Sequence, residues 1–195
     1  VFDLVGLDKP NIGLLSPEFL DDVKNLPQKN LAVELLEKLL RDEVKARMKT
    51  DVVSEKKYSD RILETLRKYH NRAIETAQVI EELINMAKEM SDDAEEANKL
   101  GLNFDEIAFY RALIQNESAV KELGDNNLKE LAKYVTEQLR KSTTVDWQVR
   151  DSVRAKLRNL VRRALRRWKY PPDKADEAID LCLKQAEALS ESWSA

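Results

Sequence analysis

The sequence is poor in residues that interrupt helices or cross-link a chain: its 195 residues include four Gly, five Pro and one Cys. The single Cys182 cannot form an internal disulfide, and no apolar run approaches the roughly 18 to 20 residues that a membrane-spanning helix requires. We therefore expect a soluble cytoplasmic protein with no membrane partner. Because the chain begins without Met or a signal peptide, we interpret it as a piece of a larger protein.

The sequence also lacks the usual combinations of catalytic and metal-binding residues. Its one histidine, His70, has no Ser or Cys partner nearby in sequence, and Cys182 lies on an apolar stripe. There is no phosphate-binding glycine loop followed by Lys and Ser or Thr, and no cluster with metal-ligand spacing. We expect no catalytic residue, no metal site and no cofactor in this chain.

Leu, Ala, Glu, Lys and Arg dominate the composition, and 35% of residues are charged, which is typical of long helices. We predict an all-α fold. Ser16 and Pro17 favour a helix start, and apolar residues at helical spacing predict a core-facing helix from Asn30. The expected helices cover about 16–27, 30–48, 54–90 with Ser54 as the cap, 104–115, 117–123, 126–142, 146–169 and 173–192.

The apolar stripe over 58–90 resembles a short coiled-coil seam, so the fold class is a multi-helix bundle with a long coiled-coil-like helical pair and a second helical subdomain. The stripe alone does not identify the helix that packs against it, which could be residues 30–48 of this chain, a second copy or another protein. An acidic run and Gly101 over 91–103 place a boundary there. The predicted divisions are a connector at 1–15, a long-helix subdomain at 16–100 and a C-terminal subdomain at 101–195.

Positive charge is concentrated between residues 140 and 169, mostly in the predicted helix 146–169, although the whole chain has a net charge of −3. Residues 140–169 contain eleven Lys and Arg against only Asp146 and Asp151. At 100° per residue one face of the helix is apolar and the cations flank it on both sides. The candidate binding residues are Arg154, Arg158, Arg162, Arg163, Arg166, Arg167 and Lys169.

Four residues of the same helix are predicted to have structural roles. Arg150 falls within the apolar arc, where an unpaired charge is costly, and Asp146 one turn earlier is its nearest candidate partner. Trp147 and Trp168 complete this set. For the flanking cations three interpretations remain: a solvated face, a surface for duplex phosphates, or a surface for an acidic protein. No zinc-finger, RNA-binding or helix-turn-helix pattern favours base-specific recognition.

Five segments together resemble a known family: "NLAVELLEKLLRDEVKAR" (30–47), "YHNRAIETAQVIEELINMAKE" (69–89), "FDEIAFYRAL" (104–113), "VDWQVRDSVRAKLRNLVRRALRRWKYPPDK" (145–174) and "AIDLCLKQAEAL" (178–189). In this order they are similar to the C-terminal helical region of the R subunit, the motor and endonuclease subunit, of type I restriction-modification enzymes. The aromatic segment and the arginine helix with its double-proline stop are the most specific parts.

The resemblance implies a non-catalytic module. In that family the nuclease and the ATP-hydrolysing, Mg-dependent helicase-like domains lie elsewhere in the subunit, and the helical C-terminal part docks the motor onto the methyltransferase core. The implied partners are the modification and specificity subunits, with duplex DNA gripped through phosphates by Arg162, Arg163, Arg166 and Arg167. The alternatives are a helical adaptor that binds an acidic protein and has no DNA role, and an enzyme with an unrecognised helical site.

Overall fold

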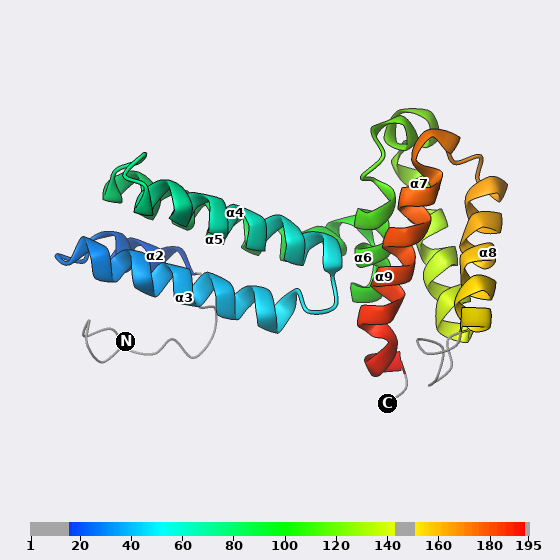
Figure 1. The fold of residues 1–195 in the computed structure, drawn as a ribbon, viewed down its shortest axis with the longest axis horizontal. Helices are drawn as coiled ribbons and strands as arrows, with labels where there is room; N and C mark the ends of the chain where they lie inside the picture. The colour runs from blue at the N-terminus through cyan, green and yellow to red at the C-terminus, as the bar shows by residue number, and fades with distance from the viewer. Residues whose placement is uncertain (1–15, 143–150, 194–195) are drawn as a thin grey trace. The chain divides into compact units, whose positions relative to one another are not determined.

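The computed structural model describes residues 16–142 and 151–193, and within these ranges the fold is all-α, as predicted, with no strand (Figure 1). Most of the predicted helices are present, with shifted ends. The described elements are α2 (Pro17–Lys24), α3 (Lys29–Arg47), α4 (Val52–His70), α5 (Thr76–Leu100), α6 (Phe104–Leu113), α7 (Glu117–Ser142), α8 (Asp151–Arg167), a 3-10 turn at Pro172–Lys174 and α9 (Ala175–Trp193).

The chain divides into two compact units, each formed from two stretches of sequence. The first unit comprises Val1–Met48 and Glu55–Glu96, and the second comprises Lys49–Ser54 and Ala97–Ala195. One border therefore falls inside α5, within the range 91–103, and the acidic run there is helical rather than a break. The short stretch Lys49–Ser54 belongs to the second unit although no sequence pattern indicated it.

The first unit packs α2, α3, α4 and α5 around one apolar core. Ser16 accepts a hydrogen bond from the Phe19 N–H at 3.3 Å and begins α2, as predicted, and Figure 1 shows α2 alongside α3. The apolar stripe of α3 is buried, which confirms its predicted core-facing role. The core includes Leu20, Leu35, Leu36, Leu40, Tyr58, Ile62, Leu66, Leu83, Met86 and Met90.

The single helix predicted over 54–90 is wrong, because the chain turns between α4 and α5. Arg72 has φ 54°, and the Ala73 N–H donates to the Lys68 carbonyl at 2.8 Å while the Arg72 N–H donates to the Tyr69 carbonyl at 2.9 Å. This is the Schellman pattern that ends a helix. The predicted cap is also corrected: Asp51, not Ser54, precedes α4 and accepts from the Ser54 N–H at 3.1 Å.

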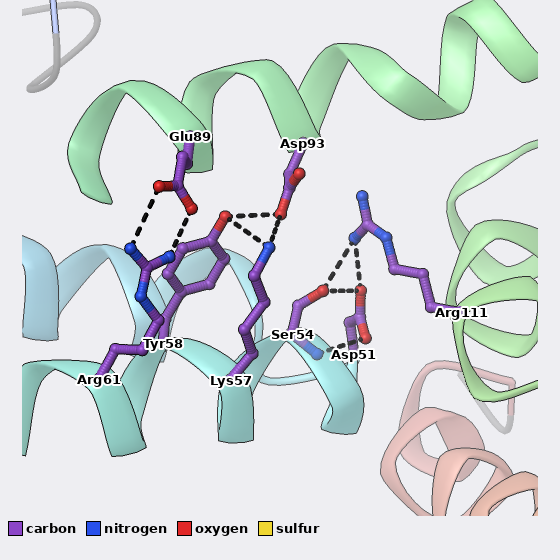
Figure 2. A network of polar contacts seen from close by, with 8 residues as sticks. All are labelled: Asp51, Ser54, Lys57, Tyr58, Arg61, Glu89, Asp93 and Arg111. Carbon is purple, nitrogen blue, oxygen red and sulfur yellow. Dashed lines mark hydrogen bonds and ion pairs between the residues drawn. The ribbon is translucent and has the colours of Figure 1, made fainter. Parts of the chain in front are cut away.

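Polar contacts join α4 and α5 as antiparallel neighbours in the first unit (Figure 2). The Tyr58 hydroxyl donates to Asp93 at 2.5 Å and Lys57 pairs with the same carboxylate at 3.1 Å, while Arg61 forms an ion pair with Glu89. Burial, reinforced by the Asp93 carboxylate, raises the pKa of the Tyr58 phenol well above its usual range. The two halves of the predicted stripe therefore pack together, and with α3, in one core.

The second unit is a group of four helices, α6, α7, α8 and α9, around a separate core (Figure 1). Asn103 and Glu106 form a capping box that begins α6. Gly124 interrupts α7 with φ 74° and ψ 164°, in agreement with the predicted stop, and Cys182 is fully buried, as its apolar stripe indicated. The buried residues include Phe109, Leu113, Leu128, Leu131, Val135, Leu139, Leu157, Val161, Leu165, Ile179 and Leu183.

A buried polar cluster holds the stretch 49–54 within the second unit. Arg111 of α6 pairs with Asp51 at 2.6 Å and contacts the Ser54 hydroxyl at 3.0 Å (Figure 2). The carboxamide of the fully buried Gln185 accepts from the Val52 N–H at 3.0 Å and donates to the Thr50 carbonyl. Both polar ends of this buried amide are thus satisfied by main-chain groups.

Candidate functional site

The arginine-rich helix is α8, and its apolar face packs into the core of the second unit. Leu157, Val161, Ala164 and Leu165 are buried, as the helical wheel predicted. The helix ends at Arg167 rather than at 169, because Lys169 has φ 56° and the Tyr170 N–H donates to the Leu165 carbonyl at 2.9 Å. Three residues with predicted structural roles lie outside the described residues: Asp146, Trp147 and Arg150.

One flank of α8 faces α9 and forms ion pairs with it. Arg158 pairs with Asp180 at 2.5 Å, and Arg162 pairs with Asp176 at 3.3 Å. Because the two pairs are one helical turn apart on each helix, α8 and α9 lie antiparallel at this edge. These pairs were not predicted, although the sequence contains a signal for them. Asp176 and Asp180 are spaced i and i+4 shortly after the double-proline turn, where a short connection can bring them opposite the arginines.

The other flank of α8 faces α7. The Arg167 guanidinium lies 5.4 Å from the ring centre of Tyr134 and 5.1 Å from that of Trp168, and the two rings are 4.9 Å apart. These distances are within the range of cation–π contacts. Both rings are half-buried against the core, so Arg167 covers aromatic surface while its charge stays at the exterior.

The remaining cations of α8 and its end are exposed, and none has a carboxylate partner among the described residues. Arg163 donates to the Asn159 carbonyl at 3.3 Å, a contact that leaves its charge uncompensated. The structure thus divides the seven candidates into three groups: Arg158 and Arg162 in ion pairs, Arg167 stacked, and Arg154, Arg163, Arg166 and Lys169 exposed and unpaired within the described ranges.

This arrangement can bind anions through charge. Arginine presents a planar fork of N–H groups that matches phosphate or carboxylate oxygens, and exposed side chains can adjust to a partner at little cost. The neighbouring helix α7 differs, because Lys129, Lys133 and Lys141 each pair with a carboxylate of the same helix. Among the described residues, α8 and Lys169 therefore supply a group of exposed cations without a carboxylate partner.

The other sequence candidates are placed as follows. His70 is the exposed last residue of α4, not a mid-helix residue, and its Nδ1 lies 2.7 Å from the Leu66 carbonyl. Burial raises the pKa of the Cys182 thiol to about 12. In the part of the chain that the structure describes, no group of three or more His, Cys, Asp or Glu is placed to hold a metal ion, and no helix is long and apolar enough to cross a membrane.

Comparisons with known proteins give one family. The family model described as type I restriction enzyme HindI endonuclease subunit-like, C-terminal, matches residues 1–192. The type I restriction enzyme HindI endonuclease subunit of Haemophilus influenzae is 46% identical over 191 residues, covering 98% of this chain and 18% of the relative. The putative type I restriction enzyme MjaIXP endonuclease subunit of Methanocaldococcus jannaschii is 33% identical over 161 residues, covering 81% of this chain and 15% of the relative.

The chain spans less than a fifth of the length of these two curated relatives. No solved structure matches it. The family-model match over residues 1–192 includes all of α8.

Proposed function

Because this chain belongs to the family of C-terminal regions of HindI-like type I restriction endonuclease subunits, we propose that it is a non-catalytic docking module of such a subunit. It attaches the ATP-dependent translocase and endonuclease to the methyltransferase core in the cytoplasm and contacts duplex DNA without sequence specificity. Its protein partners are the modification and specificity subunits of the complex. ATP and Mg²⁺ are assigned to other parts of the longer subunit.

One observation carries the DNA part of this proposal: Arg163 and Arg166 are exposed on α8 and have no carboxylate partner in the described ranges. Because Arg163 and Arg166 are three residues apart, they lie close together on the exposed side of one helix and form a positive surface there. Charge of this kind attracts phosphates of any sequence, which suits a protein that must hold DNA while the duplex moves. The absence of a base-reading motif in the sequence agrees with this mode of contact.

The test for DNA binding is fluorescence anisotropy of a random-sequence duplex titrated with the 195-residue chain at several salt concentrations. The variant R163E/R166E reverses two unpaired charges, and K38E/K45E makes the same change of net charge on exposed residues of α3 in the first unit. Non-specific binding has a Kd of roughly 10⁻⁴ to 10⁻⁶ M at physiological salt, so the titration starts at low salt.

We expect R163E/R166E to lose binding by at least about tenfold, since each phosphate contact contributes a slope of about −0.9 in log K against log salt. K38E/K45E should bind much as the wild type does. Circular dichroism should show the same helical content in all three proteins. Equal binding by the two variants would contradict the DNA contact.

The docking part needs a separate readout. The full-length subunit carrying R163E/R166E is mixed with the methyltransferase core, and co-elution is compared with the wild type and with K38E/K45E. Retained co-elution together with lost DNA binding assigns α8 to DNA. Lost co-elution with unchanged DNA binding would assign α8 to an acidic protein surface instead, which is the adaptor alternative. Failure of the wild-type subunit to co-elute would contradict docking by this region.

A further inference from the structure

Two carboxylates of α9 occupy the arginines that would otherwise extend the positive surface of α8. Asp180 holds Arg158 at 2.5 Å, and Asp176 holds Arg162 at 3.3 Å. The side chains of Asp180 and Asp176 are 53% and 78% exposed, and those of both arginines are more than a third exposed. Ion pairs this open to water contribute little net stability and are easily exchanged for other partners.

The packing of α8 on α9 does not depend on these pairs. Leu157, Val161 and Leu165 of α8 are buried in the same core as Ile179 and Leu183 of α9. Apolar burial of this extent contributes far more to the helix contact than two solvent-exposed ion pairs. Arg158 and Arg162 can therefore leave their carboxylates without separating the helices.

We propose that Asp176 and Asp180 compete with DNA phosphates for Arg162 and Arg158 and thereby limit the affinity of this surface for DNA. This inference rests on the proposed DNA contact. A phosphate oxygen and a carboxylate oxygen offer an arginine the same kind of charge-assisted hydrogen bond. When phosphate binds, the exposed carboxylates return to water at little cost, although their negative charges still repel the duplex.

The proposed competition limits which cations meet DNA first. With the carboxylates present, only the unpaired cations, among them Arg163 and Arg166, meet phosphate without displacing another partner. A contact limited in this way has a faster dissociation rate than one using every arginine of the helix, because affinity differences within one interface lie mostly in dissociation. The acidic pair thus keeps a sequence-independent surface from holding one position on the duplex for long.

The test compares D176N/D180N with E122Q/E177Q in the same anisotropy titration. Both variants remove two negative charges from the second unit, but Glu122 and Glu177 are exposed and pair with no arginine of α8 among the placed residues. Glu177 also matches Asp176 in lying in the first turn of α9, where acids favour the helix dipole. A third variant, D176E/D180E, keeps both charges.

We expect D176N/D180N to bind the duplex about tenfold more tightly than E122Q/E177Q near 0.1 M salt, with a salt slope steeper by about 1 to 2, because two further phosphates are neutralised. D176E/D180E should bind as the wild type does. Helical content and the urea midpoint show whether each variant is folded. If D176N/D180N is unstable, D176E/D180E still tests the role of the charge, because a changed salt slope in D176E/D180E would contradict the inference.

The outcomes separate the inference from the function on which it rests. If D176N/D180N and E122Q/E177Q have equal affinity and equal slope while R163E/R166E loses binding, the competition is wrong and the DNA contact stands. If D176N/D180N binds DNA and the wild type does not, the two carboxylates block DNA binding completely, which supports the inference. No binding by any variant at low salt overturns both.

Discussion

Replacing Arg111 by Met should destabilise the second unit by about 2 to 4 kcal/mol. The Asp51 and Arg111 side chains are only 7% and 14% exposed, and their charged atoms are 2.6 Å apart. Removing one partner of a buried pair costs about 3 to 5 kcal/mol because it leaves an uncompensated charge. Asp51 keeps the hydrogen bonds from the Ser54 N–H at 3.1 Å and hydroxyl at 2.8 Å, which lowers the expected cost.

The unfolding of each unit can be followed separately. All three tryptophans, Trp147, Trp168 and Trp193, belong to the second unit, so urea unfolding followed by tryptophan fluorescence reports on that unit while circular dichroism reports on both. The free energy of unfolding comes from the midpoint and the slope. A control measured by circular dichroism is R61M in the first unit, because the Arg61–Glu89 pair is much more exposed and its loss should cost at most about 1 kcal/mol.

A double-mutant cycle isolates the pair. D51A/R111M removes both charges, so its loss should be smaller than the sum of the two single losses by at least about 1 kcal/mol. A loss below about 0.5 kcal/mol in R111M, or one equal to that of R61M, would refute the argument that burial makes this ion pair important.

Two further predictions concern α7 and its neighbour α6. Replacing Gly124 by Ala should cost about 1 to 3 kcal/mol by the same fluorescence assay, because φ 74° with ψ 164° is a conformation that glycine favours. The cost comes from the backbone and not from crowding, since beyond the local backbone nothing lies within 4 Å of the added Cβ. An unchanged urea midpoint would contradict this. Hydrogen bonds from Lys129 and, to a lesser extent, from Tyr110 lower the pKa of Asp125 in the folded chain. The stability that these bonds contribute is therefore present above the unfolded pKa of about 3.9 and is lost as the pH falls through the lower folded pKa. The urea midpoint should drop less between pH 6 and 3 in D125N than in the wild type.

The sequence predicted the helices well where an apolar stripe agreed with a helix boundary residue. The stripe of α3, the Ser16 cap and the stop at Gly124 all appear as expected. The turn at Arg72 was missed because residues with positive φ are usually Gly or Asn, and Arg72 is neither. The apolar spacing also continued through this segment, so nothing local distinguished two antiparallel helices from one long helix.

For the candidate site, the sequence located the cations but not their partners. The wheel placed cations on both flanks of the apolar face. In the structure, Arg158 and Arg162 lie on one flank and Arg167 lies on the other. That Asp176 and Asp180 face the first flank depends on how α9 returns against α8, which is a tertiary contact. The pairing of Arg111 with Asp51, 60 residues apart, had no signal in the local sequence.

Gln185 has a consequence for how this region can change among relatives. Its two hydrogen bonds are to main-chain groups of residues 50 and 52, so the side chains at those positions can vary while the bonds persist. Glu at 185 could not donate and Leu could do neither, so the amide itself is constrained. Among relatives, we therefore expect the glutamine at 185 to be conserved while the residues at 50 and 52 vary independently of it. An analysis of covarying positions would not detect the two hydrogen bonds that hold the stretch 49–54 in its unit.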